Sequence, residues 1–72
     1  MQLSEIKAGE FAIIITIENI PLRLLELGLL KGEKVKILKK GIGKGPILVK
    51  LKDKNIAISH SLAEKIKVNL AK

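Results

Sequence analysis

The chain has 72 residues, of which 47% are apolar, 29% are charged and only one, Phe11, is aromatic, and its formal net charge is +7. This length allows one small domain, residues 1–72, with one aliphatic core, and it excludes a catalytic cleft between two lobes. The absence of cysteine excludes disulfides and thiol chemistry, and no apolar stretch approaches the ~18 residues that a membrane span needs. We therefore expect a cytoplasmic protein that does not span the membrane.

Residues 10–18 predict the first strand. Apolar Phe11, Ile13, Ile15 and Ile17 stand at every second position, which is the pattern of a strand with one buried face. We expect these odd-numbered side chains to face the core. Ile14 breaks the alternation, and it is expected to meet a second apolar surface, either the helix that follows or a partner.

Residues 21–27 predict a short helix. Pro21 suits a first helical turn and Gly28 suits a C-terminal stop. Leu22, Leu25 and Leu29 lie three and four residues apart, so we expect them to form the buried side of the helix. A helix of about two turns is not stable alone and must be held by packing.

The remaining elements are mostly strands. Residues 33–39 and 47–52 alternate apolar and lysine side chains and are joined by a glycine-rich loop, which predicts a hairpin. Residues 56–58 and 66–70 predict two more short strands, and Ser61 with Glu64 matches a capping box for a helical turn over 62–65. The prediction is a mainly β fold: a small, partly open barrel of about five strands, with one short helix after the first strand and one helical turn before the last.

The whole net charge lies on the predicted hairpin. Residues 34–52 hold no acid but seven lysines: Lys34, Lys36, Lys39, Lys40, Lys44, Lys50 and Lys52. One interpretation is a solvated face that keeps the protein soluble. The other is a docking surface for an acidic partner or for anionic lipid headgroups. Specific nucleic-acid binding is disfavoured, because Arg23 is the only arginine and Phe11 the only aromatic, although weak nonspecific affinity for phosphates is compatible with lysines alone.

Candidate chemistry is sparse. Residues 41–45 resemble a phosphate-binding loop, but Gly45 follows Lys44 where such a loop needs Ser or Thr. His60 is the only histidine, and Glu64 is its nearest potential co-ligand, whereas a transition metal needs about four ligands. We expect no catalytic residue, no metal site and no cofactor. His60 remains a weak candidate for contact with Fe2+ or another divalent ion, including in a site shared between two chains of a homo-oligomer.

Two apolar residues, Leu30 and Ile42, fall in predicted turns. Single exposed aliphatic side chains are common in soluble proteins. If these two gather with Ile14, however, they form a contact patch. Together with Arg23 and the hairpin lysines, Leu30 and Ile42 are therefore candidate partner-binding residues.

The central segment resembles the FeoA family, small cytoplasmic proteins of bacterial ferrous iron transport. The similarity begins with Leu3 and Gly9–Glu10, centres on residues 23–29, Gly32 and residues 35–38, and continues through residues 45–46, Val49, residues 56–58 and residues 63–68. The same domain resembles the C-terminal module of DtxR-type metal-dependent repressors, and no helix-turn-helix precedes it here, which favours a stand-alone protein.

This resemblance implies an SH3-like barrel that assists FeoB, a membrane Fe(II) transporter with a cytoplasmic GTPase domain. Its role would be accessory or regulatory, through contact with the GTPase or a membrane-proximal region. The chain departs from the family pattern at Lys31, where proline is frequent, at residues 44–46, which lack a frequent Asp before the proline, and at Ser59, which replaces a common arginine. Polar contacts made by those usual residues are therefore not expected here.

Overall fold

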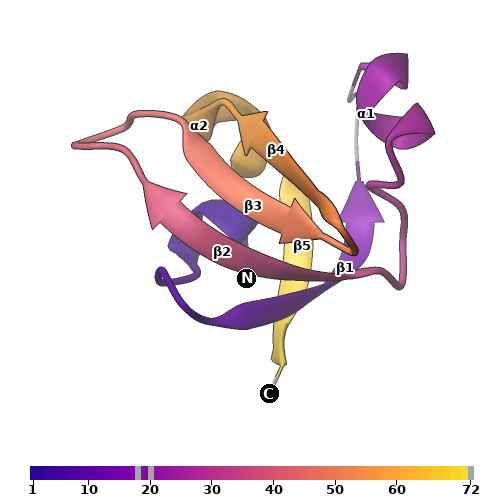
Figure 1. Cartoon of the computed structure of the whole chain (residues 1–72), viewed down its shortest axis with the longest axis horizontal. Helices are drawn as coiled ribbons and strands as arrows, with labels where there is room; N and C mark the ends of the chain where they lie inside the picture. Colours follow the sequence, from indigo (N-terminus) through magenta and orange to yellow (C-terminus); the bar gives the residue numbers. More distant parts are fainter. Residues whose placement is uncertain (18, 20, 72) are drawn as a thin grey trace.

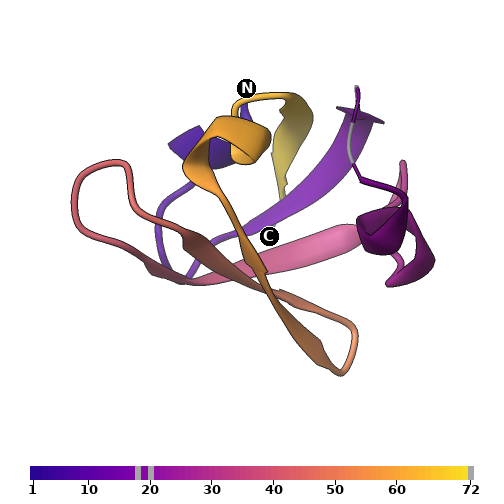
Figure 2. The same ribbon diagram turned by 90° about the horizontal axis from the view of Figure 1, so that it is seen from above.

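The computed structural model describes residues 1–17, 19 and 21–71 of the chain. Its elements follow the order η1 (Leu3–Glu5), β1 (Phe11–Ile17), α1 (Leu22–Glu26), β2 (Lys34–Lys40), β3 (Ile47–Leu51), β4 (Lys54–Ile58), α2 (His60–Ala63) and β5 (Ile66–Ala71). The five strands form one antiparallel sheet in the order β4-β3-β2-β1-β5, which curls into a small SH3-like barrel (Figures 1 and 2). This confirms the predicted fold class. The expected end of the first strand, Glu18, lies outside the described residues.

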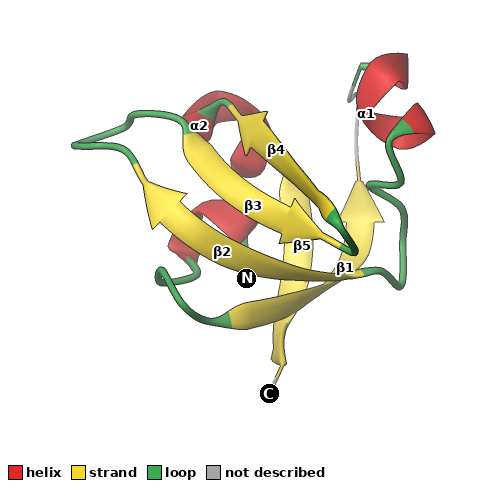
Figure 3. Ribbon diagram, viewed as in Figure 1, coloured by secondary structure: helices red, strands yellow, loops and turns green. Residues whose placement is uncertain are grey.

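The interior of the barrel is aliphatic, as the composition predicted. Its buried side chains come from all five strands and from the segments that close the ends of the barrel: Leu3, Ile6, Ala12, Ile14, Leu24, Leu29, Val35, Ile37, Ile47, Val49, Leu51, Ile56, Ile58, Ala63, Ile66 and Val68. The N-terminal segment supports the edge of β5, where the Val68 N–H donates to the Met1 carbonyl at 2.7 Å. The short helical segments η1, α1 and α2 lie at the ends and sides of the sheet (Figure 3).

The predicted orientation of the first strand was wrong for most of its length. Ala12 and Ile14 are the buried residues of β1, whereas Phe11 and Ile15 are only partly buried and Ile13 is 40% exposed. The register with β5 shifts between Ile14 and Thr16. Beyond this bulge the side chains that face the core come from odd-numbered rather than even-numbered residues. Beyond the bulge Ile17 lies opposite Ile66 and packs against the core, as predicted.

The helix α1 is where it was expected, but a different face is buried. Leu24 is 6% exposed and Leu22 is 69% exposed, while Leu25 is only partly buried. Pro21 is the N-cap rather than the first helical residue. Gly28, with φ +105°, ends the helix in a Schellman arrangement: its N–H donates to the Leu25 carbonyl, and the Leu29 N–H donates to the Leu24 carbonyl. This turn places Leu24 and Leu29 together against the core.

The second helical turn, α2, starts two residues earlier than predicted. Ser59, not Ser61, is its N-cap, because the Ser59 hydroxyl accepts a hydrogen bond from the Leu62 N–H at 3.3 Å. A capping box that the sequence analysis did not identify lies at η1, where the Gln2 N–H donates to the Glu5 carboxylate at 2.6 Å. Both caps satisfy backbone groups that have no partner within so short a helix.

Candidate functional site

Five of the seven hairpin lysines share the outer face of the sheet. Strand alternation places Val35 and Ile37 inside and Lys34 and Lys36 outside, and Lys36 lies directly opposite Lys50 of β3. We call this surface the lysine face, and it consists of Lys34, Lys36, Lys39, Lys50 and Lys52.

Phe11 of β1 flanks the lysine face, where it is the register partner of Lys36. The Lys34 and Lys36 Nζ atoms lie 4.8 Å and 5.4 Å from the centroid of its ring, within the range of cation–π attraction. Around the ring is a surface depression of about 350 Å³ lined by Phe11, Lys34, Lys36, Leu38, Lys50 and Lys52. At its rim the Lys52 ammonium pairs with Glu33 at 3.1 Å. The ring therefore brings cationic side chains together over a partly apolar floor.

The lysine face works against the stability of the fold. Lys36 and Lys50 are cross-strand register partners, and like charges that lie directly opposite each other destabilise a sheet. A solvated face that served only solubility does not require two lysines directly opposite each other. An anionic group bound over this pair would relieve the repulsion.

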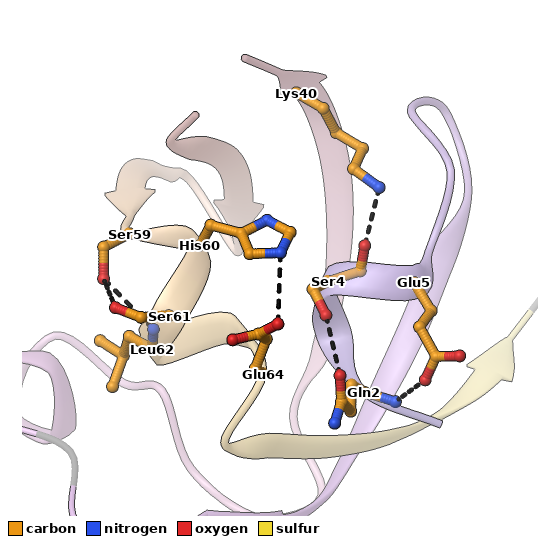
Figure 4. Close-up of polar contacts among 9 residues, drawn as sticks. All are labelled: Gln2, Ser4, Glu5, Lys40, Ser59, His60, Ser61, Leu62 and Glu64. Carbon is orange, nitrogen blue, oxygen red and sulfur yellow. Dashed lines mark hydrogen bonds and ion pairs between the residues drawn. The ribbon is translucent and has the colours of Figure 1, made fainter. Parts of the chain in front are cut away.

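The two remaining hairpin lysines point elsewhere. The register of β2 and β3 shifts between Ile37 and Lys39, and beyond this bulge Lys40 lies opposite the buried Ile47. Its ammonium donates to the Ser4 carbonyl of η1 at 2.7 Å, which ties the hairpin to the N-terminal segment (Figure 4). Lys44 lies in the exposed loop between β2 and β3. Lys40 and Lys44 therefore lie outside the lysine face, although both belong to the same hairpin.

A second candidate surface surrounds α1, which stands apart from the strands in Figure 1. Of its neighbouring leucines, Leu22 and Leu30 are 69% and 47% exposed, and Leu25 and Leu27 are partly buried. We call Leu22, Leu25, Leu27 and Leu30 the leucine end. Isolated exposed aliphatic residues are ordinary, whereas several apolar side chains that gather around one helix are a candidate contact surface.

Two grooves flank α1. The groove toward β1 has a volume of about 310 Å³ and is lined by Ile15, Thr16, Ile17, Leu25, Leu30 and Lys31. The groove toward β4 has a volume of about 520 Å³ and is lined by Arg23, Leu24, Leu27, Lys54, Asn55, Ile56 and Ala57. Both grooves have apolar floors with cationic residues among their linings. This places two of the predicted partner-binding residues, Arg23 and Leu30, beside the same helix.

Leu30, Ile42 and Ile14 do not gather into one contact patch. Ile14 is buried in the core, and Leu30 and Ile42 lie beyond opposite ends of β2. Ile42 is fully exposed in the glycine-rich loop, which projects from the barrel in Figure 1. It therefore does not extend the leucine end.

The candidate metal ligand His60 pairs with Glu64 only. Its Nε2 lies 3.5 Å from Glu64 Oε2, one helical turn away, and its side chain is 19% exposed (Figure 4). Among the described residues, no group of three or more His, Cys, Asp or Glu side chains gathers at one place. A divalent transition ion is bound by about four ligands, and the His60–Glu64 pair supplies two. The described residues of one chain therefore do not form a complete metal site.

Sequence reasoning missed the residues that organise both surfaces. Phe11 was assigned to the core, but it lines the depression in the lysine face. Leu22 and Leu25 were assigned to the buried side of the helix, but they belong to the leucine end. The signal that was available is the excess of apolar residues: a five-residue helix cannot bury leucine on every side.

The family model for the FeoA domain matches residues 1–70. The solution structure of FeoA from Chlorobium tepidum is 33% identical, with a TM-score of 0.91, and the match covers 100% of this chain and 71% of that one. The zinc complex of FeoA from Stenotrophomonas maltophilia is 32% identical, with a TM-score of 0.81 and coverage of 96% and 89%. Comparison with curated protein sequences finds no match.

The barrel also occurs as one module of larger proteins. The repressor ScaR with bound Zn2+ matches with a TM-score of 0.79 at 18% identity, over 94% of this chain but 35% of that one. At this identity the similarity concerns the fold alone. In the described part of the chain, no helix has the length and apolar character that crossing a membrane requires.

Proposed function

The chain belongs to the FeoA family, which is associated with ferrous iron transport, and from this premise we propose that it is an accessory protein of Fe2+ uptake. It acts in the cytoplasm by contact with the cytoplasmic GTPase or membrane-proximal region of a FeoB-type transporter. A relative of 32% identity has been described as a prokaryotic SH3 domain protein and a candidate activating factor of ferrous iron transport. The chain performs no chemistry of its own in this role.

The leucine end is the observation that supports this proposal best. Leu25 and Leu27 belong to residues 23–29, which carry part of the resemblance to the family, and Leu22 and Leu30 flank that segment. Within residues 22–30 only Leu24 and Leu29 are buried. Leu24, Leu27 and Leu29 pack in or against the core, whereas Leu22 and Leu30 are exposed. An apolar surface with Arg23 at its rim suits a protein partner, because interfaces combine apolar anchors with a polar rim.

An effect on the transporter requires more than binding. A partner shifts a conformational equilibrium only by as much as its affinities for the two states differ. If the chain regulates the nucleotide cycle, it must therefore bind the nucleotide-loaded and empty forms of the GTPase with different affinities.

The test is capture of the transporter's purified cytoplasmic domain by the immobilised full chain, with and without guanine nucleotide. We expect capture by the wild type and loss of capture by Leu22→Glu, which places a charge in the leucine end without disturbing the core. Ile42→Glu is the control, because it places the same charge on another exposed aliphatic position, away from α1. Equal capture by all three proteins, or no capture by the wild type in either nucleotide state, would refute the proposal.

A second candidate function is direct binding of a divalent metal, supported by the His60–Glu64 pair. A homo-oligomer would bring two such pairs together and complete a four-ligand set. Anaerobic calorimetry with Fe2+ tests this: micromolar binding that disappears in His60→Ala and promotes association of the chain would support the second function. An absence of heat at millimolar Fe2+ would eliminate it.

A further inference from the structure

The lysine face carries an inference about a second kind of partner. We propose that it docks the chain on the surface of a lipid bilayer rich in anionic phospholipids. The face lies on the outer side of β1, β2 and β3, whereas the leucine end surrounds α1, and the two surfaces share no residue. Docking on lipid would therefore leave the leucine end free for a protein.

The first step is that the ligand is a field of negative charges rather than one anion. The depression is lined by four lysines, Phe11 and Leu38, so its side chains include no hydroxyl, amide or guanidinium group. Sites for a single phosphate fix the oxygens with backbone N–H groups or planar arginine forks. Lysine ammonium groups are point charges on flexible stems, and they suit an array of charges whose positions adjust.

The second step concerns the apolar side chains between the lysines. Ile13 is 40% exposed, and Phe11 and Leu38 are partly buried within the same outer surface. Lysine stems can lie along such a floor while their ammonium groups extend toward water or headgroups. A surface of lysines with interspersed apolar groups matches the headgroup boundary of a bilayer, which offers both anionic charge and apolar depth.

The third step excludes the other polyanions. Nucleic-acid binders stack bases on aromatic rings, but the Phe11 ring is already engaged by the ammonium groups of Lys34 and Lys36. A folded acidic protein would have to present carboxylates over the opposed pair, Lys36 and Lys50, and over the lysines around it. Lipids diffuse laterally and gather around any arrangement of cations, so a bilayer imposes no such requirement.

The experiment measures partition of the full chain onto vesicles, with no transporter present. Vesicles of phosphatidylglycerol and phosphatidylcholine are compared with vesicles of phosphatidylcholine alone, at low and high NaCl, by flotation. Each lysine near an anionic surface strengthens binding by about fivefold. We expect Lys36→Gln with Lys50→Gln to lower the partition coefficient by about 25-fold.

The matched control removes the same number of charges elsewhere. Lys65→Gln with Lys67→Gln takes two exposed lysines from the α2–β5 region and leaves the lysine face intact. We expect this control to retain most of the wild-type binding to the anionic vesicles. Far-UV circular dichroism verifies that both double variants remain folded.

Several results would overturn the proposal. These are equal losses in the two double variants, binding that does not weaken at high salt, or equal binding to neutral vesicles. Competition by inorganic phosphate beyond that of NaCl at the same ionic strength would indicate a site for a single anion instead. Tighter retention on duplex DNA or polyglutamate than on the anionic vesicles at physiological salt would assign the face to a macromolecule. Because no assay here contains the transporter, these outcomes are independent of the proposed function.

Discussion

Truncation of Leu24 tests how α1 is attached to the barrel. Leu24 is 6% exposed and belongs to the core, whereas Leu22, two residues earlier in the same helix, is 69% exposed. Leucine-to-alanine substitution in a core costs 2–5 kcal/mol, and the lower half of this range applies where a site near the surface relaxes partly. We therefore expect Leu24→Ala to lower the free energy of unfolding by about 2–3 kcal/mol and Leu22→Ala to change it by no more than about 0.5 kcal/mol.

The loss would be a large fraction of the total, since 72 residues correspond to roughly 4–11 kcal/mol of stability. It corresponds to a fall in Tm of roughly 10–20 °C for a domain of this size. The measurement is thermal and urea unfolding by far-UV circular dichroism, because the chain has no Trp or Tyr for fluorescence. The helix propensities of the two variants are equal, so they cancel in the comparison. Similar losses in both variants, or a neutral Leu24→Ala, would refute the assigned orientation of α1.

Two further substitutions test the helix end and the lysine face. Gly28→Ala should lower the free energy of unfolding by about 1–3 kcal/mol, because Gly28 has φ +105°, a backbone conformation in which alanine is strained. The added Cβ itself would lie at an ordinary 3.4 Å from the Leu51 side chain, so the cost comes from the backbone. An unchanged urea midpoint would contradict this prediction. Lys50→Glu should raise stability by about 0.2–1 kcal/mol at low salt, because it replaces repulsion across from Lys36 with attraction. The gain should shrink as NaCl is added, and a salt-independent gain would show that electrostatics is not its cause.

The sequence predicted the hairpin of β2 and β3 well because two signals agree there. The period-two pattern places Val35, Ile37 and Val49 inside, and the glycine-rich loop between the strands permits the reversal. What the sequence could not indicate is the bulge between Ile37 and Lys39. One extra residue in a strand changes the face of everything beyond it, and this is why Lys40 leaves the lysine face.

The boundary residues of the helix predicted its position in the chain, but they did not predict which of its faces is buried. Pro21 and Gly28 mark the start and the stop in any environment, since they act through local backbone geometry. The buried side of α1 depends on where the barrel lies, and five consecutive helical positions contain too little periodicity to decide it. The same holds for the candidate surfaces. The sequence singled out the lysines, Arg23 and Leu30 as candidates, but which of them lie together depends on the register of the sheet.

The failure of alternation in β1 has a physical meaning that connects the core with both surfaces. A strand with one polar face shows a clean period of two. β1 carries apolar residues on both of its faces, because both faces make apolar contacts. Ala12 and Ile14 fill the core, Phe11 lies under the ammonium groups of the lysine face, and Ile15 and Ile17 line the groove beside α1. Since β1 lies between β2 and β5 in the sheet, a change in its register would displace all three sets of contacts at once. The register of β1 therefore sets how the lysine face and the groove beside α1 lie relative to each other, and a variant that shifts this register should alter both proposed contacts together.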